Sequence, residues 1–186
     1  MSTQTPSRVS LPTATWNVDP AHSQVEFRVK HVGIATFKGR FTAFDGVIRT
    51  EDDSVASVEG SVDVSSIRTN DERLDGHLQS PDFFDAENHP KITVKTTGPA
   101  EAAGDGLRLR ADLTIRGITK PVEFDVKIEG HGVDPWGNER IALAALAEID
   151  RTDWNITWNT LLENGSQYLG ERVTLVLDAE AIRQAA

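Results

Sequence analysis

The sequence predicts an all-β fold, an antiparallel sheet that closes into a barrel, from the spacing of its apolar residues and from its short connections. Apolar and polar side chains alternate with a period of two along most of the chain, most clearly in Leu107–Arg116. Successive strand side chains point to opposite faces, so such a segment buries one face and exposes the other. Most of these segments are joined by short turns rather than by helices, which favours antiparallel pairing. Such a sheet must close or pair to hide its apolar face.

We expect about eight or nine strands. The clearest are, in order, Thr13–Val18, Ser23–His31, Val55–Val64, Lys91–Thr97, Leu107–Arg116, Val122–Ile128, Arg140–Ile149 and Val173–Leu177. The apolar phase changes between Phe41 and Phe44, within a stretch rich in Gly and Phe, which predicts a bulge or a tight corner. The triplet Gly104-Asp105-Gly106 marks a hairpin turn. Arg140–Ile149 is apolar in both phases, so we expect it to be buried on both faces or to be partly helical.

Two segments interrupt the strands with helical signals. A capping-box spacing and two leucines four residues apart predict a short helix over Asn70–Ser80, near residues 70–80, which Pro81 ends. A helical segment is also expected near residues 153–163, where Asp153 could cap the first turn.

The composition restricts the class of partner. The chain has 19 Lys and Arg against 29 Asp and Glu, a formal net charge of −10, which argues against nucleic acid or an anionic membrane surface as a general partner. It has no cysteine, and therefore no disulfide and no thiolate metal site. No apolar run approaches the ~20 residues of a membrane span, and residues 1–15 lack the apolar core of a secretion signal. We therefore expect a cytoplasmic protein with a flexible tail at residues 1–12.

Several short motifs follow one another, in a particular order and spacing, between about Trp16 and Ala179. They are Asp19-Pro20-Ala21-His22-Ser23; Gly39, Phe41, Phe44 and Gly46; Thr69, Arg73, His77 and Leu78; Asp82-Phe83-Phe84; His89-Pro90; Leu113–Thr119; and Arg151-Thr152-Asp153. This succession resembles the YceI-like family, also described as polyisoprenoid-binding proteins. In one respect the chain departs from that pattern: near Arg151 the family usually has an aromatic residue followed by Gly, whereas here Trp154 is followed by Asn155.

The resemblance implies an extended, lipocalin-like antiparallel eight-stranded β-barrel over residues 13–186, with an apolar tunnel that carries a long isoprenoid lipid of polyprenyl or quinone type. Such a protein would store, shield or transfer its lipid, with transient membrane contact. The expected lipid-binding residues are Phe27, Val29, His31, Phe37, Phe41, Val58, Val62, Ile92, Val94, Leu109, Leu113, Phe124, Val126 and Leu143. Of these residues, His31 could touch the polar head group of the lipid. Arg73, which lies on the expected helix and outside this set, could contact a phosphate in the head group.

Two other classes of function remain open at this point. An enzyme could act on a small apolar substrate in the same cavity, with His31 as acid or base, although the sequence has no G-x-S-x-G elbow and no Gly-rich nucleotide loop. Alternatively, the barrel could be solid, with the same residues packed as its core.

The five histidines do not have the spacing of adjacent metal ligands: His22, His31, His77, His89 and His131. We therefore expect no metal. For the lipid-binding function we also expect no catalytic residue and no cofactor other than the bound lipid. A homodimer through one barrel edge is compatible with the sequence.

Overall fold

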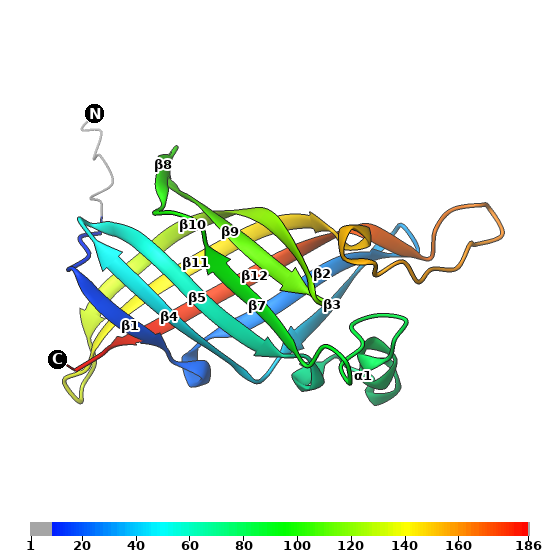
Figure 1. Cartoon of the computed structure of the whole chain (residues 1–186), viewed down its shortest axis with the longest axis horizontal. Coiled ribbons are helices and arrows are strands. Elements are labelled where there is room, and N and C mark those ends of the chain that lie inside the picture. The colour runs from blue at the N-terminus through cyan, green and yellow to red at the C-terminus, as the bar shows by residue number, and fades with distance from the viewer. Residues whose placement is uncertain (1–8, 186) are drawn as a thin grey trace.

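In the part of the chain that the structure describes, twelve β-strands form one antiparallel sheet that closes into a long barrel (Figure 1). The structure, a computed structural model, describes residues 9–185. The strands are β1 (Ala14–Val18), β2 (Gln24–His31), β3 (Ala35–Phe41), β4 (Phe44–Glu51), β5 (Ser54–Asp63), β6 (Ile67–Arg68), β7 (Lys91–Thr96), β8 (Glu101–Ala103), β9 (Gly106–Ile115), β10 (Ile118–Val133), β11 (Glu139–Asp150) and β12 (Leu169–Arg183). The helical elements are α1 (Glu72–Gln79) and three 3₁₀ turns, η1 (Pro20–His22), η2 (Val64–Ser66) and η3 (Arg151–Trp154).

The twelve strands make an eight-stranded barrel because three of its strands are interrupted. β1 continues into β2 across η1, β3 into β4 across a two-residue corner, and β5 into β6 across η2. β12 closes the ring by pairing with β2 along its first part and with β1 near its end. β8 pairs only with β9 and lies outside this ring. The expected eight-stranded antiparallel barrel is therefore confirmed.

The corner between β3 and β4 confirms the predicted change of phase. Phe37 and Phe41 of β3 face the interior, and Phe44 resumes that role in β4. The corner is held by Thr42, whose backbone N–H donates to the carbonyl of Ser66, 3.2 Å away in η2. The interruptions of neighbouring strands are thus tied to one another.

The first predicted helix is confirmed, and the second is wrong. α1 begins at Glu72 and is capped by the carboxylate of Asp71. Near residues 153–163, only η3 is helical, and it is capped by Asp150 rather than by Asp153. The segment that follows η3 does not continue as a helix, because several of its backbone carbonyls bond to the buried side chain of Arg151.

Two further expectations need correction. Leu11 is buried and its N–H donates to the carboxylate of Asp53, so the flexible tail predicted over residues 1–12 does not extend to Leu11; residues 1–8 lie outside the described part. Arg140–Ile149 is neither partly helical nor buried on both faces. It belongs to β11, where the outward-facing apolar residues are mostly alanines and where Leu146 is about half exposed.

The two ends of the barrel differ. At one end, which we call the closed end, Trp16 is completely buried and its indole N–H donates to Thr50 Oγ1 at 2.8 Å. The other end, which we call the loop end, carries α1 and the connection from η3 to β12, which projects beyond the strands (Figure 1). Leu11, Ile141 and Ala181 are also buried, as is expected where the closed end is packed.

The Phe27 ring packs directly against Gly39, where only a residue without a Cβ atom leaves room for it. A Cβ atom at Gly39 would overlap that ring, which also packs against the rings of Phe37 and Phe41. We expect Gly39→Ala to lower the free energy of unfolding by about 1–3 kcal/mol, because the displaced ring must leave its packed position. Urea unfolding measures the effect. Gly132→Ala is the control, because a Cβ there meets nothing within 4 Å; equal losses in both variants would contradict this reading.

An ion-pair network joins the strands near the closed end. The Arg140 guanidinium donates to Asp19 (2.9 Å), Asp134 (2.7 Å) and Glu180 (2.6 Å). Hydrogen bonds from His22 and from Arg140 hold the pKa of Asp19 below its ordinary value. Desolvation raises the pKa of Asp134, but hydrogen bonds from Asn138 and Arg140 outweigh it and hold that pKa well below its usual range.

These lowered pKa values predict how stability changes with pH. A carboxyl whose pKa is depressed by folding stabilises the protein above its unfolded pKa, and this contribution is lost as the pH falls through the folded value. We expect Asp134→Asn to lower the melting temperature at neutral pH, and the gap from the wild type to narrow below about pH 4. Circular dichroism melts between neutral and acidic pH measure both; a gap that stays constant would contradict the assignment.

Candidate functional site

The barrel is hollow. A cavity of about 570 Å³ follows the barrel interior, and its lining is almost entirely apolar. All fourteen residues predicted to bind lipid lie in this lining, from Phe27 on β2 to Leu143 on β11. The hollow interior rules out the solid barrel, whereas the role of these residues in binding remains a prediction.

Small inward-facing residues leave room for the cavity. Eight strands enclose a space that side chains can nearly fill, so the sizes of these residues decide whether the space is empty. Among the described residues, six glycines and alanines line the cavity: Ala35, Gly46, Gly60, Ala111, Ala145 and Ala179. None of these six was among the predicted lining residues, although the alternation in Leu107–Arg116 already placed Ala111 on the apolar face.

The residues that line the cavity differ in how far they are buried. Lining residues of β9, β10 and β11, such as Leu109, Phe124 and Leu143, are buried. Val62 of β5 and Val94 of β7 are only partly buried although they face inward. The same holds for Val173, Leu175 and Leu177 of β12, which were predicted as a strand but not as lining residues.

Aromatic rings gather where the cavity reaches the loop end. The rings of His31 and Tyr168 meet edge-on with their centroids 4.6 Å apart. His77 makes the same type of contact with Trp158, at 5.0 Å, and Phe83 lies 5.3 Å from Trp158. These five residues, which we call the aromatic rim, all line the cavity. Phe83, Trp158 and Tyr168 were not predicted as lining, because they lie on connections rather than on alternating strands.

Three polar groups of the aromatic rim are uncommitted. Within residues 9–185, the His31 ring nitrogens, the Tyr168 hydroxyl and the Trp158 indole N–H have no hydrogen-bond partner. None of these atoms is buried out of reach, since no buried side-chain N or O atom of the described residues lacks a partner. The rim can therefore offer hydrogen bonds to a molecule in the cavity.

The side chain of Arg151 is buried beneath the loop end. Its guanidinium donates to the backbone carbonyls of Ile156 (2.6 Å), Gly170 (2.8 Å) and Trp158 (3.0 Å). It forms no ion pair with any described residue, and Asp153 is exposed. Burial lowers the pKa of the guanidinium. Because its N–H groups are directed at carbonyls, Arg151 holds the η3–β12 connection in place rather than offering its charge to a ligand.

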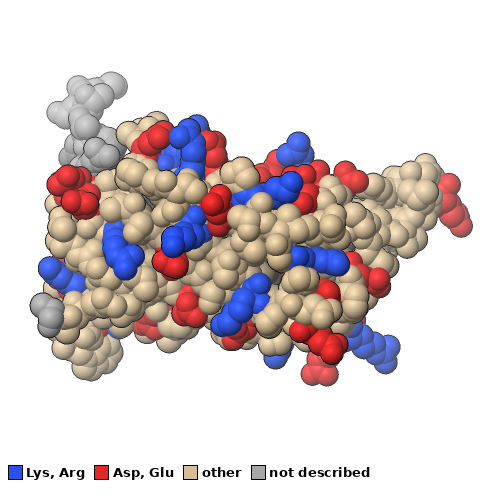
Figure 2. Space-filling view, viewed as in Figure 1, with Lys and Arg blue, Asp and Glu red and all other residues tan. Residues whose placement is uncertain are grey.

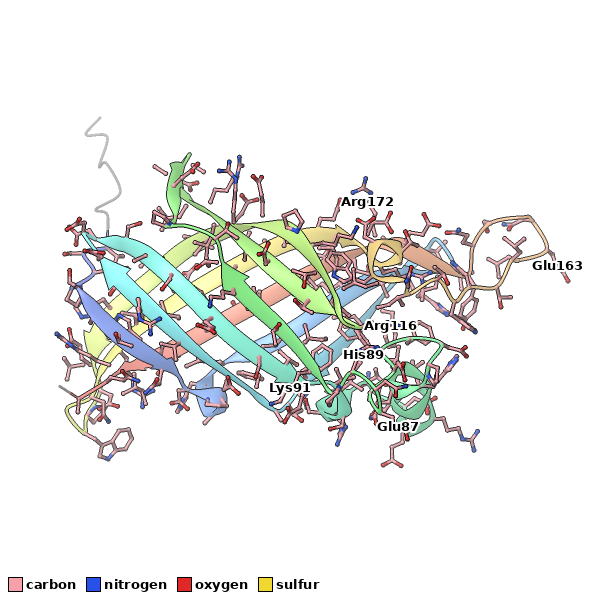
Figure 3. The ribbon with its side chains drawn as sticks, viewed as in Figure 1. Glu87, His89, Lys91, Arg116, Glu163 and Arg172 are labelled. Carbon is pink, nitrogen blue, oxygen red and sulfur yellow. The ribbon has the colours of Figure 1, made fainter. Side chains whose placement is uncertain are left out.

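Arg116 holds the other segment that covers this end. It lies with Gly117 in the two-residue turn between β9 and β10, and both residues have positive φ angles. Its Nη1 donates to the carbonyl of Phe83 at 2.7 Å and also to those of Pro81 and Asn155. Figure 3 shows Arg116 next to His89, where the barrel meets the connection from α1 to β7.

The sequence matches the model of the YceI-like domain over residues 16–181. The chain belongs to the YceI-like family. It is 36% identical to the UPF0312 protein ECA1782 of Pectobacterium atrosepticum over 165 residues, which cover 88% of this chain and 82% of that protein. It is 34% identical to Protein YceI of Escherichia coli O157:H7, with 88% and 83% covered.

Solved structures of similar proteins have the same fold. The Campylobacter jejuni YceI protein has a TM-score of 0.71 at 26% identity, covering 84% of this chain and 90% of that one. BcnA of Burkholderia cenocepacia has a TM-score of 0.75 at 22% sequence identity, and the match covers 88% of this chain and 98% of that one. A polyisoprenoid-binding domain from Saccharophagus degradans has a TM-score of 0.69 at 15% sequence identity, and the match covers 93% of this chain and 100% of that one. The likenesses below 25% identity concern the fold alone.

The structure explains how the chain tolerates its departure from the YceI-like pattern after Trp154. Asn155 ends η3 in the left-handed conformation, with φ of 57°. Glycine adopts this conformation without steric cost, and asparagine is one of the few other residues that does so readily. Asn155 therefore makes the turn for which the family usually has Gly, and the fold is kept.

The remaining candidate residues are placed differently from expectation. Arg73 lies on the exposed face of α1 and outside the cavity lining, so its position does not support the predicted head-group contact. Asp19, His22 and Glu180 bring three potential metal-ligand atoms together. However, the Arg140 guanidinium donates to both of these carboxylates and supplies the positive charge there. Within residues 9–185, no helix is long and apolar enough to cross a membrane.

Proposed function

We propose that this YceI-like protein binds one long isoprenoid lipid in its barrel cavity and stores or transfers it. The observation that carries the proposal is the cavity itself, about 570 Å³ with an almost wholly apolar lining. This volume is within the range of roughly 300–1,000 Å³ for small-molecule sites. The Saccharophagus degradans domain named for polyisoprenoid binding has the same fold, which adds support.

The energetics favour exchange with a membrane. A lipid of ~40 carbons would gain nominally ~30 kcal/mol on leaving water, at ~0.8 kcal/mol per carbon. This exceeds the ceiling of about 18–21 kcal/mol observed for non-covalent affinities. In a membrane, however, the isoprenoid chain is already out of water, so moving it into the cavity changes the free energy little. A small difference suits a protein that must also release its lipid.

The polar groups of the aromatic rim support one orientation of the lipid. Its head would lie at the loop end, near His31, Tyr168 and Trp158, and its tail would extend toward Trp16 at the closed end. The free polar groups of the rim are an imidazole, a phenol and an indole N–H, whereas the guanidinium of Arg151 donates to backbone carbonyls and Arg73 lies outside the cavity lining. A neutral head with carbonyl oxygens, as in a quinone, therefore fits better than a phosphate.

Uptake from vesicles tests the proposed function. Phosphatidylcholine vesicles carrying isoprenoid quinones of increasing tail length are incubated with the protein, which is then separated and extracted with organic solvent. Mass spectrometry of the extract is expected to show one quinone per chain, with occupancy rising with tail length until the cavity is full. Absence of uptake at every tail length would contradict the proposal.

His31→Ala tests the head-group contact. We expect it to weaken quinone binding about 3- to 10-fold, as is typical for the loss of one hydrogen bond. Binding of an isoprenoid hydrocarbon without a head should be unchanged. Fluorescence titration with both ligands makes the comparison, and equal losses for the two would contradict a head-group role. The alternative function, an enzyme with His31 as acid or base, predicts a different result. The wild type would turn over a small apolar substrate, and His31→Ala would lose this activity while it kept lipid binding.

A further inference from the structure

We propose that the loop end docks on the surface of a lipid bilayer, with the side chains of Ile34 and Leu161 entering the membrane. The proposal rests on the proposed function, because it concerns how the lipid enters and leaves the same cavity. It assigns this role to two connections: the β2–β3 turn around Ile34, and residues 155–168 between η3 and β12, which we call the projecting loop.

Large apolar side chains are exposed on both connections. Ile34 is 83% exposed and Leu161 is 72% exposed. The two connections belong to one end of the barrel, since the N–H of Val32 donates to the carbonyl of Tyr168 at 2.8 Å. Burying such side chains in an apolar phase is favourable, so two of them on connections at the same end of the barrel favour a shared apolar partner.

The charge distribution matches an uncharged apolar surface. Glu163 is the single Asp, Glu, Lys or Arg in residues 155–168, and residues 31–37 contain none. In Figure 2 the projecting end is tan except for an acidic patch at its tip, where Figure 3 places Glu163. Neither stretch contains a basic residue, and Lys30 and Lys38 lie just outside the β2–β3 turn, so contact by the tips themselves rests on their apolar side chains and not on attraction to anionic lipids. The chemistry therefore points to apolar insertion into a bilayer with a zwitterionic surface.

The exposed tips lie next to the part of the cavity that reaches the loop end. His31 and Ala35, on either side of the β2–β3 turn, line the cavity, as does Tyr168 at the end of the projecting loop. Trp158 and Tyr168 also carry uncommitted polar groups beside apolar rings, the character that places these residue types at membrane interfaces. A lipid leaving at this end would pass into the bilayer with little of its tail crossing water.

The closed end provides a matched control. Val133, the last residue of β10, is 69% exposed, and Trp136, in the connection between β10 and β11, is 82% exposed, which is comparable to the tips of the loop end. Trp16 is buried at this end of the barrel and is not part of the cavity lining. If exposed apolar area alone governed membrane contact, both ends would dock equally well. If access to the cavity matters, only the loop end supports transfer.

The experiment compares two double variants, Ile34→Ser with Leu161→Ser, and Val133→Ser with Trp136→Ser. An isoprenoid quinone is first added from ethanol to measure equilibrium binding, and the rate of its transfer from phosphatidylcholine vesicles to protein is then followed by fluorescence. We expect the loop-end variant to bind normally but to take up the quinone about tenfold more slowly, with the closed-end variant within about twofold of wild type. Added salt should change the wild-type rate little.

The outcomes separate this inference from the proposed function. If the wild type fails to bind quinone from ethanol, the proposed function is wrong and docking loses its basis. Two results would contradict docking by these tips while leaving lipid binding intact. In the first, the wild type binds quinone but the loop-end variant takes it up from vesicles as fast as the wild type. In the second, both double variants slow quinone uptake equally. Glu163→Gln adds an independent check: removing the one charge of the projecting loop is expected to increase the transfer rate, and a decrease would contradict insertion of this tip.

Discussion

Ala145→Trp is expected to abolish lipid binding while the barrel remains folded. Ala145 faces the cavity from β11, so an indole at this position occupies space that the lipid would otherwise fill. Because protein side chains do not fill the cavity, the larger side chain need not displace the surrounding core. We expect affinity for an isoprenoid quinone to fall by about a hundredfold or more, since much of the apolar contact of the tail is lost. Fluorescence titration and lipid extraction measure the effect.

The neighbouring residue supplies the control. Ala144 lies on the same strand but points outward, away from the cavity lining. Ala144→Trp introduces the same side chain one position away and should leave binding within about twofold of wild type. If both variants bind as well as the wild type, the lipid does not lie in this part of the cavity. If both lose binding equally, the effect comes from disturbance of β11 and not from filling the cavity.

Arg151→Met is expected to cause the largest loss of stability of any substitution considered. It removes the buried guanidinium and leaves the carbonyls of Ile156, Trp158 and Gly170 without their partner. Breaking such a buried polar arrangement typically costs about 3–5 kcal/mol. Part of that cost should appear locally, because these carbonyls belong to the projecting loop and the start of β12. Limited proteolysis should therefore cut the projecting loop faster in this variant.

Arg172→Met distinguishes a buried from an exposed arginine. Arg172 pairs with Glu148 at the surface, with its side chain 75% exposed (Figure 3). Exposed pairs of this kind contribute about 0–1 kcal/mol, so we expect little change in urea unfolding. A loss below about 1 kcal/mol for Arg151→Met as well would contradict a structural role for its hydrogen bonds.

The barrel could be predicted because its signal is local. The alternation in segments such as Leu107–Arg116 identifies which side chains share a face, and closure follows from the need to bury that face. The cavity depends instead on residues brought together from distant strands. Gly46 and Gly60 are paired across β4 and β5, and Ala145 comes from β11. The volume of the cavity depends on the combined size of these side chains, and no local sequence pattern indicates it.

The loop end could not be predicted for a different reason. Trp158 and Tyr168 lie on an irregular connection, where neither a period of two nor a period of 3.6 indicates which way a side chain points. The expected helix near residues 153–163 failed because the buried guanidinium of Arg151 competes for backbone carbonyls such as that of Ile156. Similarly, Arg73 has the charge for a phosphate contact, but the position of α1 keeps it outside the cavity.

Native mass spectrometry of the protein purified without detergent, and again after incubation with quinone-loaded vesicles, tests the central claim most directly. Occupancy of the cavity by one isoprenoid lipid predicts a mass one lipid above that of the polypeptide, lost on extraction with organic solvent and absent in Ala145→Trp. A mass equal to that of the bare polypeptide in both preparations would contradict it.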